Sequence, residues 1–130
     1  MKSLEQQFNE NKPIYLQIKK KIEDQIVNDQ LQEHEQIPSI REMVNFYQVN
    51  HLTISKGVNL LVDEGIIYKK RGLGMFVAEG AKEKLIQKRK KLFSNNFVQP
   101  LIKESNKLNI SIEELIKIIK KTGSSPFPLV

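Results

Sequence analysis

The stretch from residue 38 to residue 77 constrains the fold of this chain more than any other part of the sequence. Ser39 is followed three residues later by Glu42, which is the spacing of a capping box at the start of a helix. Apolar residues then recur at helical intervals as far as Tyr47, and Asn50 can cap a second helix. The pattern predicts two short helices separated by a tight turn.

The second of these helices has one apolar and one polar face. The apolar face comprises Ile54, Val58, Leu61 and Val62, and the opposite face comprises His51, Leu52, Ser55, Lys56 and Asn59. A helix that follows a tight turn and presents a polar face matches the recognition helix of a helix-turn-helix DNA-binding protein. An ordinary pair of packed helices has the same periodicity, so the residues that follow must decide between these interpretations.

A hairpin with a basic tip follows the second helix. Gly65 is typical of a helix end, and the short apolar runs 66–68 and 75–77 flank the sequence KKRGLG at 69–74. Adjacent cations repel one another unless an anion lies nearby, and glycines permit the positive φ of tight turns. The hairpin is therefore predicted to be a wing that lies against DNA phosphates.

These motifs, in this order, resemble those of the GntR family of bacterial transcription regulators. The matching segments are 13–18 (PIYLQI), 37–42 (IPSIRE), 49–54 (VNHLTI), 64–67 (EGII) and 71–77 (RGLGMFV). The resemblance implies a winged helix-turn-helix that binds double-stranded DNA, and it favours repression over activation. The rest of the chain is similar to the YtrA subfamily, in which a small helical unit serves for dimerisation.

The resemblance also implies which residues contact DNA. They are Ser39, Arg41, Asn50, His51, Leu52, Thr53, Ser55, Lys56, Lys69, Lys70, Arg71, Gly72 and Gly74. The Arg41 guanidinium can pair with guanine O6 and N7 or hold a phosphate, the alternative being a surface ion pair with Glu42 or Glu64. His51 and Leu52 stand where many relatives have an arginine, so the operator of a relative cannot be assumed here.

Apolar spacing predicts a further helix before the central stretch. Pro13 suits its first turn, and the pattern ends near residues 29–30. Ile37 is expected to form a short strand beside the wing. The predicted order of three helices and a hairpin is that of a winged helix-turn-helix.

Two more helices are predicted after the wing. One spans residues 81–108, with a kink or break between Phe97 and Pro100, because proline removes a helical hydrogen bond and clashes with the preceding turn. The other spans 112–121, begins at a capping box of sequence SIEE, and is ended by Gly123. The fold class is thus mainly helical with a small hairpin.

The expected parts of the chain are four. They are an N-terminal arm (1–12), a winged helix-turn-helix domain (13–79), a helical dimerisation region (80–122) and a flexible tail (123–130). The C-terminal helices carry more large apolar side chains than two helices can bury by themselves. Packing on the winged domain of the same chain would explain them, as would a homodimer interface, which the YtrA resemblance implies. The residues expected at that interface are Leu85, Ile86, Phe93, Phe97, Leu101, Leu108, Leu115, Ile116 and Ile119.

Composition limits the remaining possibilities. The net charge is +6, but residues 1–80 carry 10 Lys and Arg against 11 Asp and Glu, whereas residues 81–130 carry 11 against 4. The DNA-binding prediction therefore depends on where the cations lie and not on their total. No apolar run reaches the roughly 18 residues of a membrane span, and no signal-peptide pattern opens the chain. We expect a cytoplasmic protein with no membrane association.

Catalysis and cofactors are not expected. The chain has no cysteine and only two histidines, and no metalloprotease or nucleotide-binding motif is present. A winged helix that binds a protein in place of DNA is the alternative function. The C-terminal part is too small to enclose a ligand pocket of about 300 Å³. Binding of an unidentified small-molecule effector at the dimer interface is left open.

Overall fold

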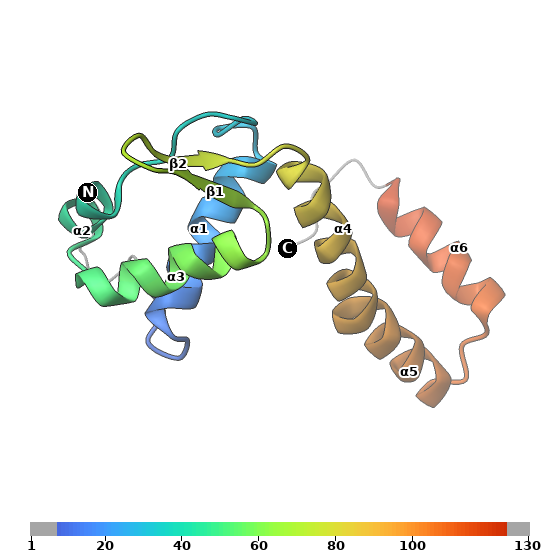
Figure 1. The fold of residues 1–130 in the computed structure, drawn as a ribbon. Helices are drawn as coiled ribbons and strands as arrows, with labels where there is room; N and C mark the ends of the chain where they lie inside the picture. The colour runs from blue at the N-terminus through green and yellow to red at the C-terminus, as the bar shows by residue number, and fades with distance from the viewer. Residues whose placement is uncertain (1–7, 125–130) are drawn as a thin grey trace. The chain divides into compact units, whose positions relative to one another are not determined.

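The computed structural model describes residues 8–124, which form two compact units with their boundary between Lys88 and Arg89 (Figure 1). Part of the predicted arm (1–7) and most of the predicted tail (125–130) lie outside the described residues. The fold is mainly helical with one two-stranded antiparallel hairpin, which confirms the predicted fold class. The elements are α1 (Ile14–Val27), α2 (Ile40–Tyr47), α3 (His51–Asp63), β1 (Ile67–Lys70), β2 (Gly74–Val77), α4 (Ala81–Phe93), a π-helical segment (Ser94–Val98), α5 (Gln99–Lys107) and α6 (Ile112–Gly123).

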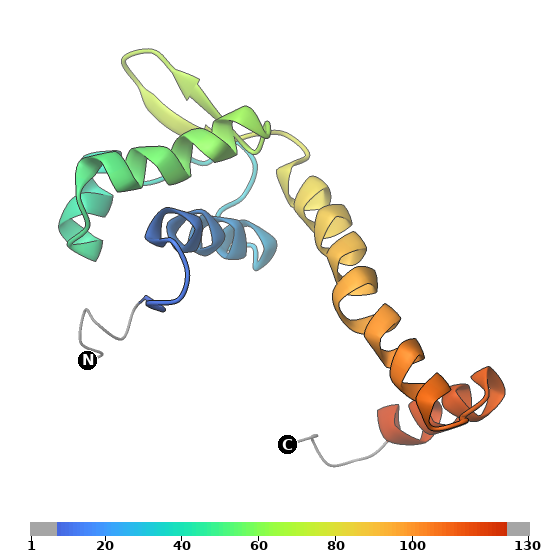
Figure 2. The same cartoon turned by 90° about the horizontal axis from the view of Figure 1, so that it is seen from below.

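The core of the first unit is centred on the contact between α1 and α3. Ile18 of α1 and Ile54, Val58 and Leu61 of α3 are fully buried. Gly57 permits the two helices to approach closely, because a Cβ at this position would lie 2.6 Å from the carbonyl oxygen of Tyr15. In the view of Figure 2, α3 runs between α1 and the hairpin.

The two predicted N-caps in the central stretch are both present. Ser39 and Glu42 form the complete capping box, each side chain accepting a hydrogen bond from the other residue's backbone N–H. Asn50 Oδ1 accepts from the N–H of Thr53 at 2.8 Å. Between the helices, Gln48 adopts a left-handed conformation with φ of 56°, which ends α2 and turns the chain into α3.

The hairpin receives a third backbone segment at its side. β1 and β2 pair antiparallel, with Tyr68 opposite Phe76. Gln36 forms an isolated bridge with Phe76, and the N–H of Ile37 donates to the carbonyl of Met75 at 2.9 Å. The strand expected at Ile37 is thus reduced to an isolated bridge, because the next alternate N–H, that of Ser39, donates to Glu42 in the capping box of α2.

The start of α4 belongs to the first unit. Ala81 and Leu85 lie one turn apart and are buried in the same core as α1 and α3. The prediction that Leu85 lies at a dimer interface is therefore wrong, because its side chain is only 1% exposed within its own chain. Helical periodicity alone could not separate this inward turn of the helix from the exposed turns that follow.

The helix continues through Pro100 by widening before it. The N–H of Gln99 donates to the carbonyl of Ser94, five residues back, within the π-helical segment Ser94–Val98. Proline lacks an N–H and its ring collides with the carbonyl four residues earlier in a regular helix. A wider turn at this point accommodates the ring, so the irregularity expected near residues 97–100 takes the form of a π turn.

The last helix begins as predicted and ends later. Ser111 Oγ accepts from the N–H of Glu114, but the Glu114 carboxylate accepts from the Ser111 hydroxyl and not from its backbone N–H, so only half of the capping box forms. Gly123 is the last helical residue and not the stop. The hydroxyl of Ser124 donates to the carbonyl of Lys120 at 2.9 Å and closes the helix end.

Replacement of Gly57 by alanine tests the close contact of α1 and α3. Alanine normally stabilises a helix relative to glycine, but here its methyl group would collide with the Tyr15 carbonyl. We expect the free energy of unfolding, measured with urea, to fall by about 1–3 kcal/mol. Gly123→Ala is the matched control, because a Cβ there meets nothing within 4 Å. A G57A variant as stable as G123A would contradict this account of the core.

Candidate nucleic-acid interface

The first turn of α3 presents an exposed, mostly uncharged surface. Leu52 is 79% exposed, although leucine is usually buried, and His51 beside it is exposed as well. Thr53 and Ser55 are half-buried, and the Ser55 hydroxyl lies 3.4 Å from His51 Nδ1. The surface therefore offers one apolar group and several short polar groups, a combination suited to thymine methyl groups and base edges.

Lys56 is held back against α1. Its ammonium nitrogen lies 4.0 Å from the centroid of the Tyr15 ring, within the range of a cation–π interaction. Sequence reasoning placed Lys56 on the DNA-facing surface without a partner. In the structure, Lys56 is exposed and its ammonium group contacts the Tyr15 ring.

The three cations of the wing have different surroundings. Lys69 Nζ donates to Asn59 Oδ1 at 3.0 Å, which ties the wing to α3. Lys70 Nζ lies 5.3 Å from the Phe76 ring centroid and 6.0 Å from that of Tyr68. Within residues 8–124, Arg71 has no ion pair or side-chain hydrogen bond. Arg71 is thus the wing cation that is most available to an anion.

The tip of the wing is fastened by a residue that sequence reasoning missed. Gln36 Nε2 donates to the carbonyl of Leu73 at 2.9 Å, and the same amide fills the space beside Gly74, where a Cβ would lie 2.5 Å from it. Gly72 and Gly74 adopt φ of 76° and 125°, values that favour glycine. A lone glutamine in a predicted loop gave no signal of this role.

A second contact joins the same segment to the base of the wing. His34 Nδ1 lies 3.0 Å from the Tyr68 hydroxyl, and the Tyr68 ring stacks on Phe76 with centroids 5.6 Å apart. The chain before α2 therefore contacts the wing at both its base and its tip. Neither residue was singled out from the sequence, because the contact joins positions far apart in the chain.

Arg41 is exposed in the first turn of α2, two residues after the N-cap Ser39. Neither acid named as an alternative partner engages it: Glu42 completes the capping box with Ser39, and Glu64 binds Lys19 and Lys88. In the described part of the chain, Arg41 forms no ion pair. Its guanidinium is available for a base edge or a phosphate.

A partly buried ion cluster underlies the end of α3. Lys19 Nζ lies 3.0 Å from Glu23 Oε2 and 3.0 Å from Glu64 Oε2, and Lys88 Nζ lies 3.0 Å from the other Glu64 oxygen. Burial disfavours charge on Lys19, but its hydrogen bonds to Glu64 and Glu23 outweigh this effect and raise its pKa. Burial likewise opposes charge on Glu64, but hydrogen bonds from Lys88 and Lys19 prevail and lower its pKa. The sequence showed only the i, i+4 spacing of Lys19 and Glu23.

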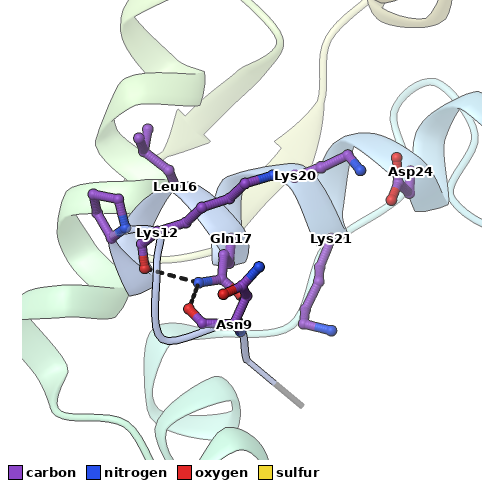
Figure 3. Close-up of a pocket in the computed structure, with 8 residues that line it drawn as sticks. Asn9, Lys12, Leu16, Gln17, Lys20, Lys21 and Asp24 are labelled. Atoms are coloured by element: carbon purple, nitrogen blue, oxygen red, sulfur yellow. Dashed lines mark hydrogen bonds between the residues drawn. The ribbon is translucent and has the colours of Figure 1, made fainter. Parts of the chain in front are cut away.

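A pocket of about 360 Å³ lies at the start of α1 (Figure 3). The Gln17 amide nitrogen donates to the carbonyls of Asn9 and Lys12, at 2.6 and 2.9 Å, and its oxygen accepts from the N–H of Asn9. These bonds satisfy the Gln17 amide and fasten the turn before the helix. The pocket contains no group that points to a particular ligand.

Residues 8–124 contain neither a metal site nor a membrane span. No group of three or more metal-ligating side chains occurs there. No helix in this range combines the length and the apolar content required to cross a lipid bilayer.

The sequence of this chain is similar to those of known bacterial regulatory proteins. The family model described as "Bacterial regulatory proteins, gntR family" matches residues 14–77. The chain is 32% identical to the uncharacterized HTH-type transcriptional regulator YhcF of Bacillus subtilis, over 90% of this chain and 95% of YhcF. It is 29% identical to the HTH-type transcriptional repressor YtrA of the same organism, over 86% of this chain and 85% of YtrA.

Solved structures agree with these similarities. A GntR-family regulator from Bacteroides thetaiotaomicron, described as putative, superposes with a TM-score of 0.71 at 38% identity, over 84% of this chain and 95% of that chain. The DNA-binding domain of AraR in complex with operator ORE1 superposes with a TM-score of 0.50 at 33% identity, over 52% of this chain and 82% of that chain.

The helix pair, the polar first turn of α3 and the basic wing define the class: a winged helix-turn-helix transcription regulator, which acts on DNA and is not an enzyme. The chain belongs to the GntR family of bacterial regulatory proteins. The resemblance noted in its sequence motifs is thereby confirmed at the level of the family.

The ion cluster predicts how stability depends on pH. Because the pKa of Glu64 is lowered in the folded state, its stabilising effect is present above its unfolded value of 4.5 and is lost as pH falls through the folded value. Because the pKa of Lys19 is raised above 10.5, its contribution is present below that pH and is lost as pH rises through the folded value.

Glu64→Gln tests the acid side of this dependence. At pH 7 we expect the variant to be less stable than the wild type by roughly 1 kcal/mol, as for a partly exposed ion pair. The difference should shrink as pH is lowered below 4.5, where protonation of Glu64 removes the same interaction. Urea unfolding at a series of pH values measures both proteins. A difference that is independent of pH would contradict the assigned role of the charge.

Proposed function

We propose that this chain is a homodimeric repressor that binds an inverted-repeat operator in double-stranded DNA and acts in the cytoplasm. The observation that carries the proposal is the shared location, on one unit, of the open first turn of α3 and the basic tip of the wing. YtrA, which is similar over nearly its full length, is named as a repressor. That similarity supports placing the chain with the short YtrA-like members of the family, although YhcF matches over a larger share of its length (95% against 85%) and at higher identity (32% against 29%).

The proposed roles follow from the positions of the side chains. The first turn of α3 enters the major groove, with Leu52 against a thymine methyl group and the remaining residues on base edges and phosphates. The start of α2 and the wing hold the flanking backbone. The residues proposed to contact DNA are Ser39, Arg41, Asn50, His51, Leu52, Thr53, Ser55, Lys56, Lys69, Lys70, Arg71, Gly72 and Gly74.

The second unit is proposed to provide the dimer interface. Large apolar side chains on its helices are exposed to solvent, including Phe97 at 64% and Leu108 at 63%. Leu115, also predicted at the interface, is already buried in the single chain at 7% exposure. The residues proposed to meet a second copy are Ile86, near the end of the first unit, and Phe93, Phe97, Leu101, Leu108, Ile116 and Ile119 of the second. A two-fold dimer would place the recognition helix α3 of each copy in successive major grooves, about 34–36 Å apart.

Footprinting on the DNA upstream of the gene, followed by gel shifts with the protected duplex, tests the function as a whole. We expect a protected site with two-fold symmetry. Failure of the purified protein to bind any such duplex at low salt would overturn the proposal.

Arg41→Ala tests base reading at the start of α2. The guanidinium is exposed and has no ion-pair partner in the described part of the chain, so its loss should not destabilise the fold. If it reads a base, we expect binding to the operator to weaken by about 1–3 kcal/mol and binding to a scrambled duplex to change little. An equal loss on both duplexes in gel shifts would assign Arg41 to a phosphate.

Arg71→Ala tests the contact between the wing and phosphates. Each phosphate neutralised by the protein contributes about 0.9 to the slope of log affinity against log salt concentration, so the slope should fall by about one unit. Lys103→Ala removes the same charge from α5, outside the proposed DNA surface, and should leave the slope unchanged. Fluorescence anisotropy at four salt concentrations provides the slopes; equal slopes for R71A and the wild type would refute the contact.

Phe97→Glu tests the proposed interface. A charge at this exposed position leaves the fold intact but cannot be buried between two subunits. We expect sedimentation to show a monomer where the wild type is a dimer. Phe46→Glu is the control, because Phe46 is 70% exposed but belongs to α2 of the first unit. A dimeric F97E, or a wild type that is itself monomeric, would refute the proposed interface.

A further inference from the structure

Successive turns of α4 contact the winged-helix unit through Lys82, Leu85 and Lys88, which are spaced three residues apart. Leu85 is the apolar contact and is buried in the core. The two lysines lie on either side of it, and both form ion pairs with acids of the same unit. This part of the helix is therefore held at three points along its length.

The first ion pair fastens the start of α4. Lys82 Nζ lies 2.9 Å from each oxygen of the Asp29 carboxylate, which follows the end of α1 in a left-handed conformation with φ of 63°. Directly before the helix, the N–H of Gly80 donates to Glu33 Oε1 at 2.7 Å. Two acids of the loop after α1 thus hold the beginning of α4.

The second ion pair joins α4 to the buried cluster. Lys88 binds one oxygen of Glu64, and the other oxygen binds Lys19, which is only 9% exposed and also pairs with Glu23. Lys88 is therefore not attached to a mobile surface carboxylate. Its partner is itself fixed from the core side by α1.

The positions of these acids are unfavourable for their own helices. Asp29 lies just beyond the C-terminus of α1, and Glu64 is the C-cap of α3. The negative end of the helix dipole disfavours a carboxylate at such positions. A lysine of α4 offsets this effect in both cases. The two acids therefore contribute to the attachment of α4 and not to the stability of the helix that each of them follows.

We propose that Lys82 and Lys88 are positioning residues that fix the direction of α4 on the winged-helix unit and thereby set the spacing of operator half-sites that the dimer accepts. α4 is a continuous helix to Phe93, past the boundary of the unit. Lys82 and Lys88 therefore constrain the turns of α4 that belong to the first unit. The inference rests on the proposed dimer of the second unit.

A distance measurement without DNA provides the first test. The chain has no cysteine, so Lys20→Cys and Lys90→Cys introduce unique sites for spin labels at exposed positions of α1 and α4. Labelled full-length protein is diluted with unlabelled protein, so that electron–electron resonance reports the distance within one chain. We expect a narrow distribution that broadens when Lys88→Met, or Lys82→Met with Lys88→Met, is added.

Matched variants separate position from charge. Lys88→Arg retains the ion pair and should retain the narrow distribution. Lys91→Met removes the same charge from the same helix at a residue with no ion pair in the described part of the chain, and should have no effect. An equally narrow distribution in K88M and in the double variant would overturn the proposal whether or not the protein binds DNA.

Operator spacing provides the second test. A duplex selected from a random library by the wild-type protein is remade with one or two base pairs added to or removed from its centre. We expect the wild type, K91M and K88R to prefer one spacing, and K88M to lose that preference by roughly 2- to 5-fold, as for one ion pair. Affinity for a single half-site should not change.

The outcomes distinguish this inference from the proposed function. Tight binding with an unchanged spacing preference in K88M would refute the positioning role and leave the function intact. A wild type that tolerates all spacings equally would also refute the positioning role. Failure of the wild type to select any duplex would refute the proposed function and the spacing claim together, and the distance measurement alone would then decide whether Lys88 orients α4.

Discussion

The structure of the first unit depends on the direct approach of the α3 backbone to α1 at Gly57. A Cβ at Gly57 would lie 2.6 Å from the Tyr15 carbonyl oxygen, so only glycine fits there, and Ile18 of α1 and Ile54 of α3 are fully buried in the same core. The side of α3 away from this contact is thereby exposed. The DNA-contacting role proposed for α3 thus depends on a residue that has no side chain and lies on the opposite, buried face of the helix.

The charged groups of this unit divide into two sets by their surroundings. Lys19, Glu23, Glu64 and Lys88 neutralise one another below α3 and determine how the elements are assembled. The wing and the start of α2 carry cations that are exposed or only loosely engaged. This division explains why a unit with little net charge can still present a basic surface. It also explains why the +6 charge of the whole chain had little predictive value.

Local signals in the sequence were sufficient for the elements and insufficient for the contacts between them. The caps at Ser39 and Asn50 and the basic hairpin were predictable because each depends on residues close in sequence. The contacts of Gln36, Lys56 and Leu85 were not, because each depends on a partner that folding brings from elsewhere. The irregularity at Pro100 was predictable in position but not in form. A kink, a break and a π turn can each accommodate a proline, which has no N–H to donate.

The segment of residues 34–37 contacts the wing at its base and tip and then leads directly into the cap of α2. The start of α2 and the wing are consequently connected through this one segment, although the whole of α3 separates them in the sequence. A surface assembled before its partner arrives has little conformational entropy left to lose on association. Insertions between α1 and α2 would displace both of these proposed DNA-binding segments at once, whereas changes at the hairpin tip can alter the wing alone.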